Sequence, residues 1–347
     1  MRVMQVMSGA RFGGAELFFV RLVLALHRSG LGQRIVMRSD ERRQEILSGA
    51  GLEPIQLPFG GLLDTVTRRT IRHAVADYRP DIILCWMNRA ARYAPTGDHV
   101  LIGRMGGYYN LKYYRHCDHI IGNTVDIVED VVQRGWPAQR THHLPNFVDV
   151  ANRATVSRNE FDTPIYAPLL LALGRLHRNK GFDVLLQGLE RLSGVYLWLV
   201  GDGPERQSLN SLAKRLRIDD RVRFLGWRED ALRLMSSADV VVCTSRHEPL
   251  GNVILEAWAA SRPVVATAAA GPRSLIDDGR SGRLVPIDDP ASLAATLDEV
   301  ITDTKHARSI AREGHARYLA NHSEQVVVAK YLDFFERMVK LCAASQV

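Results

Sequence analysis

Residues 240–267 read VVVCTSRHEPLGNVILEAWAASRPVVAT, a pattern that predicts a strand, a loop, a helix and a second strand. The apolar runs over 240–243 and 263–267 have the length and β-branched content of buried strands. Gly251 lets the backbone turn tightly between them, and Asn252 is a residue type that caps helices. In open α/β sheets, ligands bind at the loops that follow the carboxyl ends of parallel strands. We therefore expect a ligand at this loop.

Two glutamates flank the start of this helix. Glu248 precedes the helix, and Glu256 lies more than a turn inside it. A carboxylate accepts hydrogen bonds from two hydroxyl groups, as a ribose diol offers, while free N–H groups and the helix dipole favour a phosphate at the helix start. Two glutamates at this spacing also occur on ordinary surface helices. The interpretation as a sugar-nucleotide site therefore depends on the strands on either side.

Composition limits the class of protein. At 347 residues the chain is long enough for two domains, and a hydrophobic share of 46% with a charged share of 24% is that of an ordinary soluble protein. The four cysteines are isolated, so the sequence indicates neither a zinc site nor a disulfide framework. Cysteines of this kind are typical of a protein in a reducing compartment. The apolar stretch over 17–26 is interrupted by Arg21 and is too short to span a bilayer, and the sequence shows no signal peptide pattern.

The net charge of +7 favours anionic partners. The basic residues occur in small groups rather than in one long tract, which is more typical of solvated helix surfaces than of a nucleic-acid site. We therefore expect a cytoplasmic protein without a nucleic-acid partner. The charge allows peripheral contact with the inner face of the cytoplasmic membrane.

Two series of short apolar segments alternate with helical or polar sequence. The first occupies residues 3–7, 33–38, 81–86, 99–103 and 119–122, and the second occupies 169–174, 195–201, 222–226 and the two runs quoted above. This alternation predicts an α/β protein with two doubly wound parallel sheets. A polar stretch over 152–164 separates them, so we expect one domain over 1–155 and another over 164–322, followed by an amphipathic helix within 323–347.

Two more loops offer groups for a diphosphate. Gly13 and Gly14 follow the first strand and start a helix, where free N–H groups can meet an anion. Arg175 and Lys180 follow the strand over 169–174 directly, which places both cations at the carboxyl edge of the sheet. Cations there suit a leaving nucleoside diphosphate, whose charge grows as the glycosidic bond breaks. Taken singly, each of these motifs is also compatible with an ordinary turn.

A fourth loop argues against a dinucleotide site. Gly201 and Gly203 begin the pattern Gly-X-Gly-X-X-Gly, but Arg206 occupies the position of the third glycine. An NAD-dependent oxidoreductase needs the full pattern after a strand, so it is the weaker alternative. A non-enzymatic nucleic-acid binder would explain the positive charge but not the ordered set of loops.

Together these loops resemble, in the same order, the motifs of the GT4 family of retaining glycosyltransferases, which have the GT-B fold: Gly13 to Glu16, Gly174 to Gly181, Gly201 to Glu205 and Glu248 to Glu256. The resemblance implies two Rossmann-like domains facing a cleft, with the C-terminal helix crossing back to the first. It also implies transfer of a sugar from a UDP- or GDP-linked donor to a cell-envelope saccharide or glycolipid, such as lipopolysaccharide or exopolysaccharide. A sugar-nucleotide epimerase of the same fold is the alternative.

The resemblance also assigns residues. The implied catalytic residues are Glu248, near the transferred sugar, and Arg175 and Lys180, which would hold the diphosphate. The implied donor-binding residues are Gly13, Gly14, Gly201, Gly203, Pro249, Leu250, Gly251, Asn252 and Glu256, the last on the ribose. No cofactor is implied, and because the sequence lacks an Asp-X-Asp triplet we expect no metal. The implied chemistry is front-face substitution, which depends on charge stabilisation and positioning.

The acceptor side departs from the family pattern. Many relatives carry a histidine after the fourth strand, whereas residues 102–110 read IGRMGGYYN. We expect the acceptor to meet cationic, amide and aromatic side chains suited to a phosphorylated saccharide, namely Asn88, Arg89, Arg104, Tyr108, Tyr109 and Lys112. The first two would lie in the preceding loop. A tyrosine-rich surface loop that packs on its neighbours is the alternative.

Overall fold

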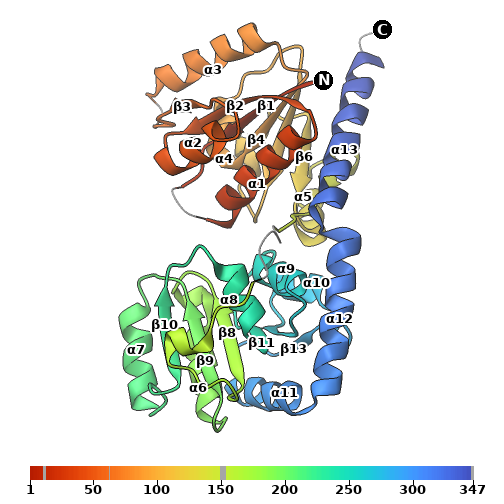
Figure 1. The fold of residues 1–347 in the computed structure, drawn as a ribbon. Coiled ribbons are helices and arrows are strands. Elements are labelled where there is room, and N and C mark those ends of the chain that lie inside the picture. Colours follow the sequence, from red (N-terminus) through yellow and green to blue (C-terminus); the bar gives the residue numbers. More distant parts are fainter. Residues whose placement is uncertain (11–12, 62, 149–153, 345–347) are drawn as a thin grey trace. The chain divides into compact units, whose positions relative to one another are not determined.

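The computed structural model describes residues 1–10, 13–61, 63–148 and 154–344 (Figure 1). The start of the expected linker, Asn152 and Arg153, lies outside this part of the chain, as do residues 345–347 of the expected terminal helix. The chain divides into two compact units: unit 1 comprises Met1–Phe147 with Glu324–Val347, and unit 2 comprises Val148–Ser323. Each unit is built on its own parallel sheet.

Unit 1 has a seven-stranded sheet in the order β3-β2-β1-β4-β5-β6-β7, with every pairing parallel. Its strands are β1 (Arg2–Met7), β2 (Gly32–Arg38), β3 (Ile55–Leu57), β4 (Ile82–Trp86), β5 (Val100–Met105), β6 (His119–Gly122) and β7 (Thr141–His143). The five longer strands confirm the apolar segments predicted from the sequence. The strand order reverses between β1 and β4, so the carboxyl ends of these two strands form a switch point.

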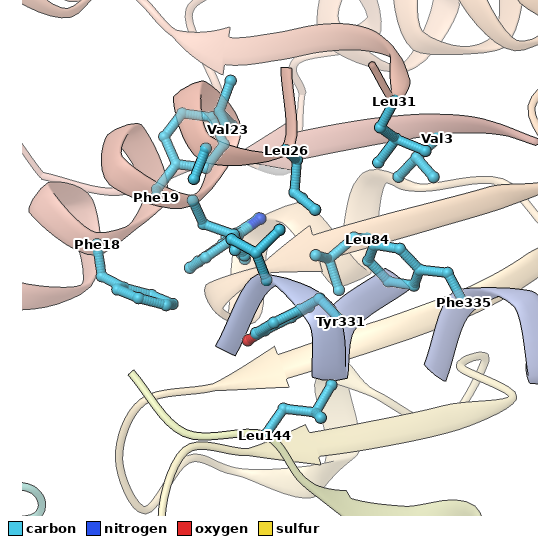
Figure 2. Close-up of a cluster of buried hydrophobic side chains, with 14 of the residues drawn as sticks. Val3, Phe18, Phe19, Val23, Leu26, Leu31, Leu84, Leu144, Tyr331 and Phe335 are labelled. Carbon is cyan, nitrogen blue, oxygen red and sulfur yellow. The ribbon is translucent and has the colours of Figure 1, made fainter. Parts of the chain in front are cut away.

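Helices cover both faces of this sheet (Figure 1). They are α1 (Gly14–Arg28), α2 (Glu41–Ser48), α3 (Thr65–Tyr78), α4 (Met87–Tyr93), α5 (Val125–Gln133) and α13 (Glu324–Ala344), with single 3₁₀ turns η1 (Leu111–Tyr113) and η2 (Ala138–Arg140). Phe19 and Leu26 of α1 and Tyr331 and Phe335 of α13 share one buried cluster (Figure 2). Each such side chain stabilises the fold by about 1.5–3 kcal/mol. The terminal helix is therefore part of the core of unit 1.

A buried cation ties α13 to the sheet. The guanidinium of Arg104, on β5, lies 4.6 Å from the ring centroid of Phe18 and 4.4 Å from that of Trp86. Its Nε donates to the hydroxyl of Tyr331 at 2.8 Å, and its Nη2 donates to Oδ1 of Asn146 at 2.5 Å. Arg104 is only 2% exposed. Aromatic faces and neutral hydrogen-bond acceptors thus stabilise a charge that water no longer reaches.

Unit 2 has a six-stranded parallel sheet in the order β10-β9-β8-β11-β12-β13. Its strands are β8 (Leu169–Leu173), β9 (Tyr196–Val200), β10 (Val222–Gly226), β11 (Val240–Cys243), β12 (Val264–Thr267) and β13 (Arg283–Val285). Its helices are α6 (Phe182–Glu190), α7 (Arg206–Arg215), α8 (Ala231–Ser237), α9 (Asn252–Ala259), α10 (Ala270–Leu275), α11 (Pro290–Thr302) and α12 (Thr304–Asn321), with 3₁₀ turns η3 (Arg158–Phe161) and η4 (Arg178–Lys180). The order reverses between β8 and β11, which are the two strands that precede the cationic loop and the glutamate loop.

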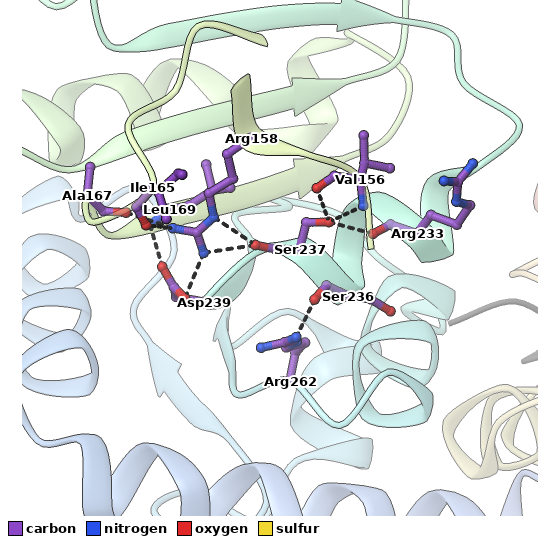
Figure 3. A network of polar contacts seen from close by, with 10 residues as sticks. All are labelled: Val156, Arg158, Ile165, Ala167, Leu169, Arg233, Ser236, Ser237, Asp239 and Arg262. Atoms are coloured by element: carbon purple, nitrogen blue, oxygen red, sulfur yellow. Dashed lines mark hydrogen bonds and ion pairs between the residues drawn. The ribbon is translucent and has the colours of Figure 1, made fainter. Parts of the chain in front are cut away.

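The described part of the expected linker packs on unit 2 (Figure 3). The Arg158 guanidinium donates to the carbonyl of Ser237 at 2.9 Å, to Oδ1 of Asp239 at 2.9 Å and to the carbonyl of Ala167 at 2.9 Å. The buried backbone N–H of Val156 donates to Oγ of Ser237 at 2.7 Å. These bonds fix the segment against the end of α8, so its polar residues reflect a hydrogen-bond network rather than a free linker.

Candidate functional site

The first two loops at the carboxyl edge of unit 2 pack backbone against backbone. The N–H of Gly174 donates to the carbonyl of Val200 at 3.0 Å, and the N–H of Leu176 donates to the carbonyl of Asp202 at 2.9 Å. Gly201 has a φ of 131°, and a Cβ built there would lie 2.0 Å from the carbonyl oxygen of Gly174. A Cβ at Gly203 would lie 2.4 Å from the carbonyl oxygen of Leu176. Glycine is therefore required at both positions for the loops after β8 and β9 to meet.

The loop after β8 is also joined to the loop after β11. Oγ1 of Thr244 donates to the carbonyl of Lys180 at 2.9 Å, and the N–H of Arg246 donates to the carbonyl of Asn179 at 2.8 Å. The Arg246 guanidinium forms a bidentate pair with Asp183 on α6, at 2.8 and 2.7 Å. Since β8 and β11 border the point of strand reversal, this junction forms the switch point of the sheet.

At this junction, the amine of Lys180 is paired with a carboxylate. Its Nζ forms an ion pair with Oε2 of Glu248, which also accepts a hydrogen bond from Oγ of Ser245 at 3.0 Å. The side chains of Lys180 and Glu248 are 25% and 13% exposed. Burial by itself would lower the pKa of Lys180, but the negative charges of Glu248 and, to a lesser extent, Glu256 outweigh it, so the pKa is raised. Lys180 therefore keeps its positive charge at neutral pH.

Helix α9, which follows the loop with Glu248, begins at Asn252, one residue earlier than it would if Asn252 were its N-cap. Gly251, at φ 91°, is the N-cap of α9, and Asn252 is the first helical residue, so the prediction that Asn252 caps the helix is wrong. Leu250 and Glu256 are buried. The N–H of Gly271, on α10, donates to the carbonyl of Glu248 at 2.8 Å. The loop is thus held from both sides, and Glu256 lies close enough to Lys180 to raise its pKa.

Not all of the predicted donor residues lie at this edge. Arg175, in the loop after β8, does lie there and is exposed. Gly13 and Gly14 are exposed at the start of α1 in unit 1. Oε1 of Glu16 accepts a hydrogen bond from the N–H of Ala10 at 2.7 Å, and a Cβ at Gly13 would lie 2.2 Å from Oε2. Glu16 was not among the predicted site residues, although it is the fourth residue of the glycine motif.

The predicted acceptor residues occupy different environments. Asn88 and Arg89 lie on α4, not in a loop, and Nη1 of Arg89 donates to the carbonyl of Phe59 at 3.1 Å. Arg104 was expected near the solvent-facing loop, but it lies inside the core because the rings of Phe18 and Trp86 enclose it. The prediction that Asn88 and Arg89 lie in a loop is therefore wrong, and so is the prediction that Arg104 faces the acceptor from the surface.

The remaining acceptor candidates do face the surface to differing degrees. Tyr108 and Lys112 are exposed, and Tyr109 is partly buried. Burial raises the pKa of the Tyr109 hydroxyl, and the negative charge of Glu16 raises it further, against an opposing effect of Arg104. Tyr109 thus lies near Glu16, beside the carboxyl ends of β1 and β5.

Known proteins resemble the chain along most of its length. The family model "Glycosyl transferases group 1" matches residues 167–303. The lipopolysaccharide core biosynthesis glycosyltransferase LpsE of Rhizobium meliloti (strain 1021) is 36% identical over 323 residues, which cover 92% of this chain and 95% of LpsE. LpsD of the same organism is 33% identical over 342 residues, which cover 98% of this chain and 99% of LpsD.

Solved structures extend the likeness to the fold. The crystal structure of HepE (Alr3699) of Anabaena in complex with UDP has a TM-score of 0.85 at 22% identity, covering 97% of this chain and 100% of HepE. At this identity the likeness shows the fold alone. The predicted GT-B fold is confirmed. The chain has two parallel-sheet units and a terminal helix, and in unit 2 a cationic loop is joined to a glutamate loop at the switch point. The chain belongs to the family of group 1 glycosyltransferases.

Proposed function

We propose that this chain is a GT4-type, retaining glycosyltransferase that moves a sugar from a nucleoside diphosphate onto a saccharide or glycolipid of the lipopolysaccharide core. The observation that carries the proposal is Lys180, which forms an ion pair with Glu248 at the switch point of unit 2 and whose pKa the charge of Glu256 also raises. A protonated amine there offers charge to a diphosphate, and the flanking carboxylates offer acceptors to hydroxyl groups. The acceptor class is supported by LpsE and LpsD, two lipopolysaccharide core biosynthesis enzymes that align with nearly the whole chain.

The chemistry follows from charge development in the transition state. The acceptor hydroxyl oxygen forms a bond to the anomeric carbon on the face from which the diphosphate leaves, and the bond between that carbon and the phosphate oxygen breaks. The leaving phosphate oxygen receives the proton of the hydroxyl. Lys180 and Arg175 stabilise the growing negative charge, so the proposal needs no metal ion. Glu248 would bind the transferred sugar and Glu256 the ribose.

The proposal predicts a nucleotide preference that thermal unfolding can measure. UDP or GDP should raise the unfolding temperature, since a ligand at 100 times its Kd stabilises a protein by about 2.7 kcal/mol. UDP is the first choice because HepE was solved with it. ADP and NAD serve as controls, and a shift with NAD alone would contradict the proposal. Retention is tested by NMR of the transferred sugar: an inverted anomeric configuration would refute the retaining assignment.

We also propose that unit 1 touches an anionic membrane through the start of α3. Leu63 and Val66 are 93% and 61% exposed there, beside the exposed Arg68, Arg69 and Arg72. None of the described helices is long and apolar enough to span a membrane. A helix surface with exposed apolar and basic side chains suits a bilayer interface. We expect co-sedimentation with phosphatidylglycerol vesicles at low salt and loss of it at high salt. Equal sedimentation with phosphatidylcholine vesicles, or none with either, would contradict the contact.

A further inference from the structure

A hollow with a strongly positive lining lies on unit 1, and none of its lining residues was assigned to the donor. Its volume is about 290 Å³, and its lining comes from the second turn of α4 and from η1 and the residues after it. The lining residues are Arg92, Lys112, Tyr113, Arg115 and His116. Of these, only Lys112 was a predicted site residue, because the others follow no motif that the sequence shares with a known site.

The charges of this hollow are unbalanced. Two of its side chains are guanidinium groups, a third is a lysine amine, a fourth is an imidazole, and no carboxylate contributes to the lining. Within the residues that the structure describes, Arg92, Lys112 and Arg115 form no ion pair, whereas Arg34, Arg140, Arg246 and Arg283 each have a carboxylate partner. Like charges so close together repel one another until an anion arrives. The hollow therefore presents a preformed set of cationic donors without a carboxylate among its lining residues.

The position of the hollow relates it to the acceptor region of unit 1. Helix α4 starts directly after β4, so Asn88 lies at the carboxyl edge of the sheet. Arg92 follows Asn88 by four residues, which is about 6 Å along a helix axis. The 3₁₀ turn η1 approaches from β5, the neighbouring strand. The hollow thus begins roughly one sugar unit away from the edge at which the acceptor is expected.

We propose that this hollow binds the phosphate group of a phosphorylated saccharide. A phosphate carries up to two negative charges and three oxygens that accept charge-assisted hydrogen bonds, and it matches a fork of two arginines and a lysine. The Tyr113 ring, with Nζ of Lys112 5.0 Å from its centroid, adds an aromatic face for the attached sugar. That this saccharide is the acceptor rests on the proposed function, whereas the binding of the phosphate does not.

Lys112 reports on this hollow directly, because a bound phosphate should shield its amine from an acylating reagent. We expect glucose 6-phosphate, at about twice its Kd, to slow acylation of Lys112 by about three-fold, as followed by mass spectrometry of the peptide. Inorganic phosphate should protect as well, and glucose should not. Lys305, exposed on α12, should react at one rate throughout. Equal rates at Lys112 with glucose and with glucose 6-phosphate would overturn the proposal.

Two double variants localise the effect. Arg92→Ala with Arg115→Ala should abolish the protection of Lys112. Arg308→Ala with Arg312→Ala removes the same charge from exposed positions on α12 and should leave the protection unchanged. Protection by phosphatidylglycerol vesicles but not by glucose 6-phosphate would overturn the saccharide assignment and make the hollow a lipid contact. If UDP or GDP raises the unfolding temperature but glucose 6-phosphate does not protect Lys112, the phosphate site is refuted and the proposed donor site is not affected.

Discussion

Lys180→Ala should weaken the binding of a nucleoside diphosphate by about 10- to 100-fold, since a hydrogen bond to a charged group contributes about 1.5–3 kcal/mol. Removing the amine takes away the cation at the switch point of unit 2. It also leaves Glu248, which is 13% exposed, without its ion-pair partner and facing the ligand with a negative charge. Calorimetric titration with UDP or GDP measures the change.

Two further variants separate the donor contact from a general change of charge. Lys305→Ala removes a lysine from the exposed surface of α12 and should leave the affinity within about two-fold of the parent value. Glu248→Gln releases Lys180 from its ion pair, so the diphosphate should bind as well or better, while sugar transfer should fall by about 100-fold or more. Lys180→Ala with an unchanged affinity would contradict the donor site.

Much of the fold could be predicted because strands and turns carry their signal locally. The apolar runs that became β8 and β11 are buried along most of their length and are followed by turns that contain glycine. By contrast, β3 and β7 contain three residues each, too few for a period to appear. α4 begins immediately after β4 without a capping side chain, so the sequence offered no start signal and predicted a loop.

The loops that carry Lys180 and Glu248 could be predicted from the sequence, but the contacts between them could not. Lys180 and Glu248 are 68 positions apart, and only the strand order of the sheet brings their loops together. Arg104 was assigned to the acceptor because a cation near two tyrosines suits a phosphorylated saccharide. Its partner Tyr331 lies 227 positions away on the terminal helix, and no local sequence pattern predicts that contact. The charged hollow combines α4 with η1 and depends on tertiary structure in the same way.

Gly201→Ala should destabilise unit 2 by about 3 kcal/mol or more and should weaken nucleotide binding with it. The φ of 131° is a conformation that side-chain-bearing residues rarely adopt. In addition, the new Cβ would meet the carbonyl oxygen of Gly174 at 2.0 Å, which is backbone and has no flexible end that can move aside. The loops after β8 and β9 would have to separate, and the loop after β8 carries Arg175 and Lys180.

Gly194→Ala is the matched control. Gly194 also has a positive φ, of 69°, but nothing lies within 4 Å of the Cβ that alanine would add. Gly194→Ala should lower the free energy of unfolding by about 1 kcal/mol, from the backbone conformation alone, and should leave the nucleotide affinity unchanged. Denaturant unfolding of both variants measures the difference, and the yield of folded protein reports a Gly201→Ala chain that fails to fold. Equal stability of the two variants would show that the two loops do not meet as tightly as the hydrogen bond from Gly174 to Val200 implies.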